Sequence, residues 1–202
     1  AQSILAEARR LTQKPNFKGY IHDLGGPTAN FRGQGCAKAR KFGPCRNKKC
    51  LYPEPCANLK PDMHEYMGLL RQVAALPGVK KVFIRSGIRY DYLLLDRSEA
   101  FLRQLTANHV SGHLKVAPEH SQPAVLAAMG KPGWAVYRRF AAKFAKQNEL
   151  LDKKQYLLPY FIAAHPGCTL QEAVQLAVQM KQGGWQPEQV QLFLPSPGSK
   201  ST

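Results

Sequence analysis

Four cysteines lie close together in the sequence, in the segment CAKARKFGPCRNKKCLYPEPC that spans residues 36–56. The candidate ligands are Cys36, Cys45, Cys50 and Cys56, with the spacing C-x8-C-x4-C-x5-C. Four thiolates suffice for a tetrahedral zinc ion or for one iron–sulfur cluster. This spacing differs from the C-x2-C pairs of common zinc sites, and it does not decide between iron and zinc.

Basic residues surround these cysteines, and we treat residues 33–60 as a Cys-rich basic insert. Between Cys36 and Lys60 the only acid is Glu54, whereas the basic residues are Lys38, Arg40, Lys41, Arg46, Lys48 and Lys49. Positive charge lowers thiol pKa values and offsets the charge of a thiolate metal site. Free thiols, or a basic nucleic-acid-binding loop that contains cysteines, are the alternatives. A fifth cysteine, Cys168, is expected to be an ordinary small residue.

The composition is that of a globular protein with an excess of positive charge. The chain has 202 residues, 44% of them hydrophobic, and Lys plus Arg number 29 against 13 for Asp plus Glu. We expect one domain over residues 1–202, and an anionic partner such as nucleic acid or a phosphate-bearing cofactor. The sequence contains no membrane-span pattern and no signal-peptide pattern. We therefore expect a cytoplasmic protein, where clustered thiols bind metal more often than they form disulfides.

Short apolar runs alternate with helical patterns along the chain. Each run is followed by Gly or Pro, and the expected strands are 19–24, 79–85, 113–117, 155–163 and 190–194. Helical periodicity is found in 1–11, in 62–76, after Ser98 as a cap, in 121–130, around 136–144 and in 170–180. This alternation predicts an α/β fold with a parallel sheet, either open and doubly wound or part of an α/β barrel. A chain that begins on a helix and without Met suggests a fragment that lacks an upstream strand.

Polar clusters follow every expected strand, namely HDLGGPTAN, RSGIRYD, APEH, HPGCT and PSPGS. The carboxyl ends of parallel strands meet at one edge of the sheet, so these clusters are expected to share a site. Gly25 and Gly26 would let the backbone approach a ligand, although they can equally form a simple turn.

The remaining candidates carry side-chain chemistry. Ser86 and Arg89 offer a hydroxyl and a cation after the second strand. Lys115 and Glu119 bracket the third, where a carboxylate can accept hydrogen bonds from two ribose hydroxyls. Glu119 can also act as the negative charge at a helix N-terminus. Histidines 22, 120 and 165 are either acid–base groups, metal ligands or hydrogen-bonded structural residues.

Several longer segments together resemble the radical S-adenosylmethionine enzymes, and in particular their YgiQ-type group. They are YIHDLGGPTAN, the cysteine segment, VFIRSGIRYDYLL, HLKVAPEHSQPAVLAAMGKP, KKQYLLPYFIAAHPGCT and VQLFLPSPGS. The resemblance implies an incomplete TIM-like (β/α)6 barrel comprising strands 2–6, with the Cys-rich insert after strand 2. It also implies that a [4Fe–4S] cluster binds S-adenosylmethionine and cleaves it to a 5′-deoxyadenosyl radical.

The same resemblance assigns the site residues. Gly25 and Gly26 match the glycine motif that holds the methionine amino group, and Glu119 matches the position near the ribose. Ser86 and Arg89 lie where the third-strand edge should face the cofactor, and Lys115 belongs to the same edge. HPGCT resembles the fifth-strand turn GxPGET of related enzymes, from which His165, Cys168 and Thr169 depart.

One defining element of the family is missing from this sequence. The family signature is C-x3-C-x2-C, and no three cysteines here have that spacing. We therefore expect the catalytic cluster to be bound by a part of the protein outside this sequence, and this chain alone to be inactive. The four cysteines are then an auxiliary iron–sulfur or zinc site. A non-catalytic, metal-stapled module that binds nucleic acid is the alternative function, and RNA or another anion is a candidate substrate.

Overall fold

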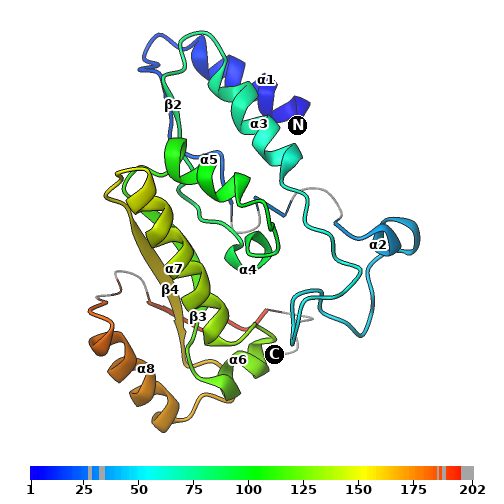
Figure 1. Ribbon diagram of the computed structural model, residues 1–202, viewed down its shortest axis with the longest axis vertical. Helices are drawn as coiled ribbons and strands as arrows, with labels where there is room; N and C mark the ends of the chain where they lie inside the picture. Colours follow the sequence, from blue (N-terminus) through cyan, green and yellow to red (C-terminus); the bar gives the residue numbers. More distant parts are fainter. Residues whose placement is uncertain (27–28, 32–34, 186, 188–189, 197–202) are drawn as a thin grey trace.

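The computed structural model describes residues 1–26, 29–31, 35–185, 187 and 190–196. Pro27 and Thr28 of the glycine motif lie outside the described residues, as do the first two positions of the insert, 33–34, and the tail 197–202. Within the described part, helices and strands alternate, as Figure 1 shows. The elements are α1 (Gln2–Thr12), β1 (Tyr20–Ile21), α2 (Ala37–Phe42), α3 (His64–Ala74), β2 (Lys81–Val82), α4 (Tyr90–Leu93), α5 (Ala100–Asn108), β3 (His113–Glu119), α6 (Pro123–Met129), α7 (Trp134–Leu150), β4 (Tyr156–Ala163), α8 (Leu170–Gln182) and β5 (Val190–Leu192).

All described strand pairs are parallel, which confirms the expected α/β class. β1 pairs with β2, and β3, β4 and β5 form a second sheet in that order. The segment after β2 lies beside β3, because Ile84 N–H donates to the carbonyl of His109 (2.9 Å) just before that strand. The strand order follows the sequence within each sheet, so neither contains the order reversal of a doubly wound sheet.

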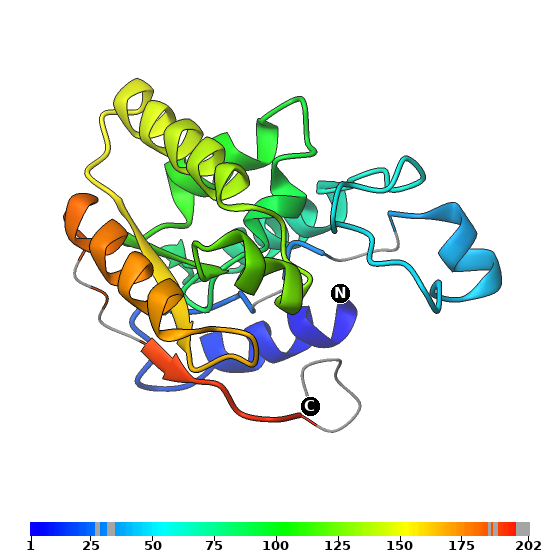
Figure 2. The ribbon, with the colours of Figure 1, turned by 90° about the horizontal axis from the view of Figure 1, so that it is seen from below.

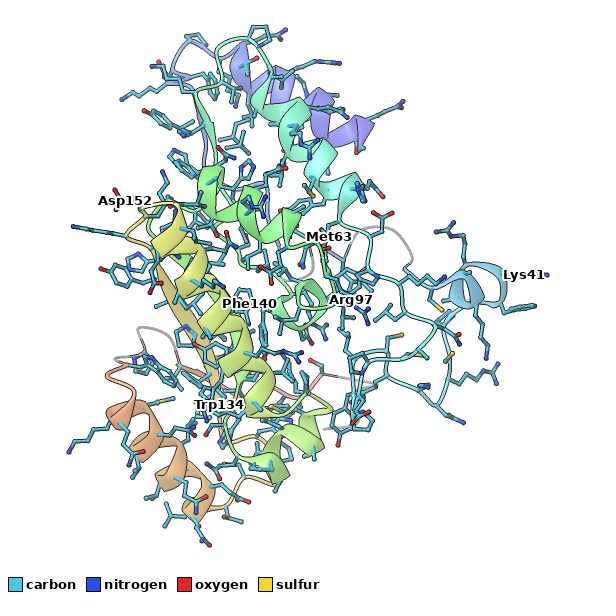
Figure 3. All side chains as sticks on the ribbon, in the orientation of Figure 1. Lys41, Met63, Arg97, Trp134, Phe140 and Asp152 are labelled. Atoms are coloured by element: carbon cyan, nitrogen blue, oxygen red, sulfur yellow. The ribbon has the colours of Figure 1, made fainter. Side chains whose placement is uncertain are left out.

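The core is formed where helices cover the strands. Along β3 the burial alternates, with Leu114 and Val116 buried toward the helices and the residues between them more exposed. α7 supplies Phe140 and Phe144 to the same core, and it packs against α4 and α5. Figure 3 shows Phe140 on the inner part of this helix. No helix in the described part of the chain is long and apolar enough to cross a membrane.

Two local expectations are wrong. The strand expected over 79–85 is a regular strand only at Lys81–Val82. Phe83 N–H still donates to the Ile21 carbonyl (2.9 Å), but Ile84 N–H donates to the His109 carbonyl instead, because the chain turns toward β3. Ser98 is not the N-cap of α5; that position is occupied by Glu99, whose φ is 54°. Ser98 lies one residue earlier, and its Oγ accepts a hydrogen bond from Ala100 N–H (3.2 Å).

The Cys-rich insert projects from the side of the molecule, as Figures 1 and 2 show for α2. Its short helix has no buried residue, yet the insert is anchored at its base. Lys60 N–H donates to the Gly35 carbonyl (2.6 Å), which ties the two ends together. Leu51 and Leu59 are buried against the core. The insert is therefore a loop with a fixed base and an exposed tip.

This placement of the core predicts the effect of truncating Phe101. Its side chain in α5 is fully buried and its ring centroid lies 5.5 Å from that of Tyr66. Phe101→Ala should lower the free energy of unfolding by about 3–5 kcal/mol. Phe42→Ala is the matched control, because Phe42 is 72% exposed, and should change it by less than about 0.5 kcal/mol. Urea unfolding followed by circular dichroism measures both, and equal losses would contradict this core.

Candidate functional site

Asp23 joins the loops that follow β1 and β2. Its Oδ1 accepts hydrogen bonds from the backbone N–H groups of Arg85 (2.9 Å) and Ser86 (3.2 Å), and Ser86 Oγ donates to its Oδ2. Partial burial opposes ionisation of this carboxyl. The bonds from the Ser86 side chain and from backbone N–H groups outweigh it and lower the pKa of Asp23 below its ordinary value. Asp23 is therefore held as a carboxylate that fixes Ser86 in place.

Three of the predicted cofactor residues line one cavity at this edge. Ser86, Lys115 and Glu119 border a cavity of about 360 Å³. Lys115 and Glu119 both belong to β3, and both line this cavity. Ile88, Val116 and Ala117 give the cavity an apolar wall. On the far side Tyr160 of β4 donates its hydroxyl to Gln191 Oε1 of β5 (2.6 Å).

Glu119 adopts a backbone conformation that is unusual for a residue with a side chain. Its φ is 72°, and the register between β3 and β4 shifts between Val116 and Glu119. Such strain persists where surrounding contacts fix it, and it is common at functional sites. Here Lys131 is the partner: its Nζ lies 2.8 Å from Glu119 Oε1 and donates to the Ala117 carbonyl (2.9 Å). The carboxylate still has acceptor positions on its other oxygen.

The two predicted glycines follow β1 beside this cavity. A side chain at Gly25 would lie 2.6 Å from Asp23 Oδ1 and 3.0 Å from the buried Ile84, so glycine is required there for close packing. The Gly25 N–H is among the groups that stabilise the Asp23 carboxylate. Gly26 uses its carbonyl to accept a hydrogen bond from Ala29 N–H (3.0 Å). The structure thus brings Gly25 to the Asp23–Ser86 contact, and its role toward a cofactor remains a prediction.

Arg89 does not line the cavity of Ser86, Lys115 and Glu119. It forms a two-point ion pair with the buried Asp91, with Nε–Oδ1 at 2.8 Å and Nη2–Oδ2 at 2.9 Å. Its backbone is clamped by Asn30, whose fully buried amide accepts from Arg89 N–H (2.7 Å) and donates to its carbonyl (2.9 Å). Arg89 lines a neighbouring cavity, of about 340 Å³, against the insert. Arg89 and Ser86 line different cavities, so the predicted contact of Arg89 with the cofactor stays a prediction.

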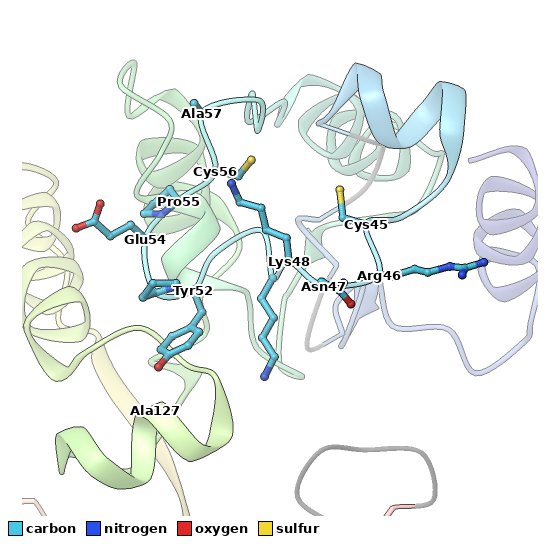
Figure 4. A pocket seen from close by; sticks show the side chains of 12 residues that line it. Cys45, Arg46, Asn47, Lys48, Tyr52, Glu54, Pro55, Cys56, Ala57 and Ala127 are labelled. Carbon is cyan, nitrogen blue, oxygen red and sulfur yellow. The ribbon is translucent and has the colours of Figure 1, made fainter.

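The four cysteines of the insert lie close enough to influence one another electrostatically. Burial raises the pKa of the Cys50 thiol, and repulsion from Cys56, Cys36 and Cys45 raises it further. The backbone N–H of Asn58 and then the Lys48 ammonium group lower the pKa of Cys56. Figure 4 shows Lys48 reaching toward Cys56 at the edge of an open basin of about 1000 Å³. Among the described residues no three potential ligands are arranged as a metal site, so metal binding here stays a prediction.

A buried thiol–imidazole contact lies at the ends of β3 and β4. His120 is 1% exposed, its Nδ1 accepts from Gln122 N–H (3.1 Å), and its Nε2 lies 3.6 Å from Cys168 Sγ. Burial lowers the pKa of His120 and raises that of Cys168, so both groups stay neutral near pH 7. His165 is also buried, and its Nδ1 lies 2.8 Å from the Pro166 carbonyl. Among the predicted histidines, His22 is exposed.

The sequence did not single out Asp23 and Lys131, which the structure places at the centre of the site. Asp23 directly follows β1, so its position at the carboxyl end of a strand was an available signal. Lys131 follows Gly130, which ends α6 in the left-handed conformation with a φ of 66°. This turn directs the chain back toward Glu119, and nothing in the spacing alone indicates it.

Comparison with known proteins gives relatives but no assigned activity. The chain is 52% identical over 200 residues to a UPF0313 protein of Clostridium perfringens (strain 13 / Type A) and, equally, to one of Clostridium botulinum (strain Okra / Type B1). These matches cover 99% of this chain but 30% and 31% of the relatives. The chain therefore spans about a third of the length of these curated relatives. No protein-family model and no solved structure matches it.

The Asp23 contacts predict a pH-dependent contribution to stability. A carboxylate with a lowered folded-state pKa stabilises the fold above its unfolded pKa, and this contribution is lost as the pH falls through the folded value. Asp23→Asn should reduce the free energy of unfolding by about 1 kcal/mol at pH 7, a modest amount because solvent screens this exposed group. The difference from the unmodified protein should shrink below about pH 4.

Asp152→Asn is the matched control for this experiment. Asp152 is exposed after α7 with a φ of 48°, a conformation that Asn also tolerates, so this change should have little effect at either pH. Urea unfolding at pH 7 and at pH 3 measures both variants. A pH-independent loss for Asp23→Asn would show that the charge of this side chain is not what stabilises the loops.

Proposed function

We propose that this chain comprises strands 2–6 of the barrel of a radical S-adenosylmethionine enzyme. The observation that carries the proposal is the meeting of Ser86, Lys115 and Glu119 around one cavity. Ser86 comes from the segment VFIRSGIRYDYLL, and Lys115 and Glu119 come from HLKVAPEHSQPAVLAAMGKP; both segments resemble parts of that family. The activity would belong to the longer protein, since this chain spans about 30% of the length of its relatives.

The strand arrangement supports a partial (β/α)6 barrel. In both sheets the strands follow one another in sequence order, and the segment after β2 lies beside β3. A barrel wall has this order, whereas an open doubly wound sheet reverses it at a switch point. In parallel α/β barrels the active site lies at the carboxyl ends of the strands, where the cavity of Ser86 and Glu119 is found.

The donor set of this cavity suits S-adenosylmethionine. The Glu119 carboxylate keeps acceptor positions for ribose hydroxyls while Lys131 holds it in place. Ile88, Val116 and Ala117 offer an apolar wall to a purine ring. With the cluster bound, the cofactor supplies a 5′-deoxyadenosyl radical. The residues of this chain would orient the cofactor and exclude water, and the ligands of that cluster would come from outside this chain.

Glu119→Gln should lower S-adenosylmethionine cleavage by the full-length protein by about tenfold in kcat/KM, because a charged acceptor for the ribose is lost. The measurement is 5′-deoxyadenosine formation after anaerobic reconstitution with iron and sulfide. Glu149→Gln, at an exposed position of α7, is the matched control and should leave the rate unchanged. Equal rates in both variants would contradict the ribose role. The absence of 5′-deoxyadenosine from the unmodified protein would overturn the enzyme proposal itself.

The insert is proposed to hold an auxiliary metal site, iron–sulfur or zinc. Cys50→Ser should then remove bound metal from this chain, because one of four ligands is lost. Cys168→Ser is the matched control, since Cys168 contacts His120 and lies outside the insert. Metal analysis with an absorption spectrum, under anaerobic conditions, measures both variants. Unchanged metal content in Cys50→Ser, or no metal in the unmodified chain, would contradict the auxiliary metal site and indicate that the four cysteines are free thiols.

A non-catalytic, metal-stapled module that binds nucleic acid is the alternative. The exposed helix α2 favours it, because this helix has no buried residue and carries Lys38, Arg40 and Lys41. Transfer RNA binding without 5′-deoxyadenosine formation, lost on changing Lys48 and Lys49 and also on changing Lys38 and Lys41 of α2, would favour this function. Salt-sensitive binding is required of such an interface.

A further inference from the structure

Lys49 links the Cys-rich insert to the end of α6, in the rest of the molecule, which we call the body. Its Nζ donates to the Met129 carbonyl (3.3 Å), eighty positions away in the sequence. It passes directly over Gly130: a side chain added there would overlap the ammonium group and lie 2.7 Å from Lys49 Cε. Gly130 also has the φ of 66° that glycine adopts most readily. This contact places one cation of the insert at a defined point on the body.

Lys49 shares a cavity with two cations that belong to the body. Arg89 and Lys131 line the same space, of about 340 Å³, between the insert and α6. None of the residues that line it is acidic. Phe31 and Tyr52 supply aromatic surface, and Lys49 Nζ lies 6.0 Å from the centre of the Tyr52 ring. The cavity therefore combines three positive side chains with an apolar wall.

The charges of these three cations are not equally neutralised. Arg89 is paired with Asp91, and Lys131 with Glu119. Within the described part of the chain, Lys49 contacts a backbone carbonyl and an aromatic ring, and no carboxylate is paired with it. The neighbouring Lys48 is directed to the other side, toward Cys56. The cavity thus retains about one net positive charge, supplied by Lys49.

We propose that this cavity binds a phosphate group of a small organic molecule. The planar fork of Arg89 is already occupied by Asp91 at Nε and Nη2, so it is not available for two-point binding of a carboxylate. What remains are N–H donors from three separate side chains. Separate donors suit the several oxygens of a tetrahedral phosphate, for which Lys acts as a point charge. The aromatic wall then contacts the organic part of the ligand.

This proposal does not depend on radical chemistry, since it concerns binding alone. The cavity is distinct from that of Ser86 and Lys115, and the Glu119–Lys131 ion pair lies between the two. If the enzyme proposal holds as well, a ligand here would be next to the cofactor cavity, as a substrate must be. A failure of one proposal leaves the other standing, because one is measured by 5′-deoxyadenosine and the other by binding.

Isothermal titration of the full-length protein tests the proposal, with inorganic phosphate, phenyl phosphate and acetate as probes at constant ionic strength. Phosphate and phenyl phosphate should bind, phenyl phosphate more tightly, and acetate should not compete. Lys49→Met should weaken phosphate binding by about tenfold or more. Lys41→Met is the matched control, because Lys41 points into solvent from α2 (Figure 3), and should change it by less than about twofold.

Gly130→Ala is a second variant that keeps every charge. Its methyl group would displace the Lys49 ammonium, so phosphate binding should fall as in Lys49→Met. Thermal unfolding of each variant shows that it is folded before binding is measured. Equal losses in Lys49→Met and Lys41→Met, or equal affinity for acetate and phosphate, would overturn the proposal. Binding of transfer RNA without binding of either phosphate probe would also overturn it, since that marks a diffuse polyanion surface.

Discussion

The carboxylate of Asp23 is the contact on which the arrangement of the site depends. β1 and β2 are short, with two residues each, and their backbone pairing continues only as far as the hydrogen bond from Leu24 N–H to the Phe83 carbonyl (2.8 Å). Asp23 extends the contact between the two segments by accepting hydrogen bonds from two backbone N–H groups and one hydroxyl of the loop after β2. Hydrogen bonds to an ionised acceptor are stronger than neutral ones, which suits a contact that must hold two loops. Ser86 and Gly25 are positioned through this carboxylate.

A second constraint acts at the end of β3, where local strain is balanced by an ion pair. The register shift and the positive φ of Glu119 turn its carboxylate toward Lys131. Lys131 can reach it because α6 ends at Gly130 and the chain returns. The same turn receives Lys49 from the insert. The end of α6 at Gly130 therefore positions residues of both cavities, and a substitution there would alter both of them.

The sequence predicts the helices and strands, which follow from the periodicity of apolar residues, better than the contacts made by residues in turns. The five parallel strands and their shared edge follow from apolar runs punctuated by Gly and Pro, and Ser86, Lys115 and Glu119 do meet there. Arg89 was expected with them from its position after the same strand. The structure pairs it with Asp91, two residues along, and its contact with a cofactor stays a prediction. Ser98 is not at the N-cap position, because Glu99 takes a left-handed conformation there, although the Ser98 hydroxyl still accepts a hydrogen bond from Ala100 N–H of α5. The contact of His120 with Cys168 joins residues 48 positions apart and depends on the packing of two loops.

In the insert, some of the positive side chains of the chain interact with groups of the protein itself. Lys48 and Lys49 are adjacent in the sequence but reach different partners on different sides of the insert. Lys48 lies beside Cys56 and lowers its pKa, and Lys49 reaches the Met129 carbonyl. A four-thiolate metal site would carry net negative charge, which Lys48 and its basic neighbours would offset. Part of the formal charge of +16 would then be balanced within the molecule. The case for a polyanion such as RNA therefore rests on α2, whereas Lys49 supports a smaller ligand held between the insert and the body.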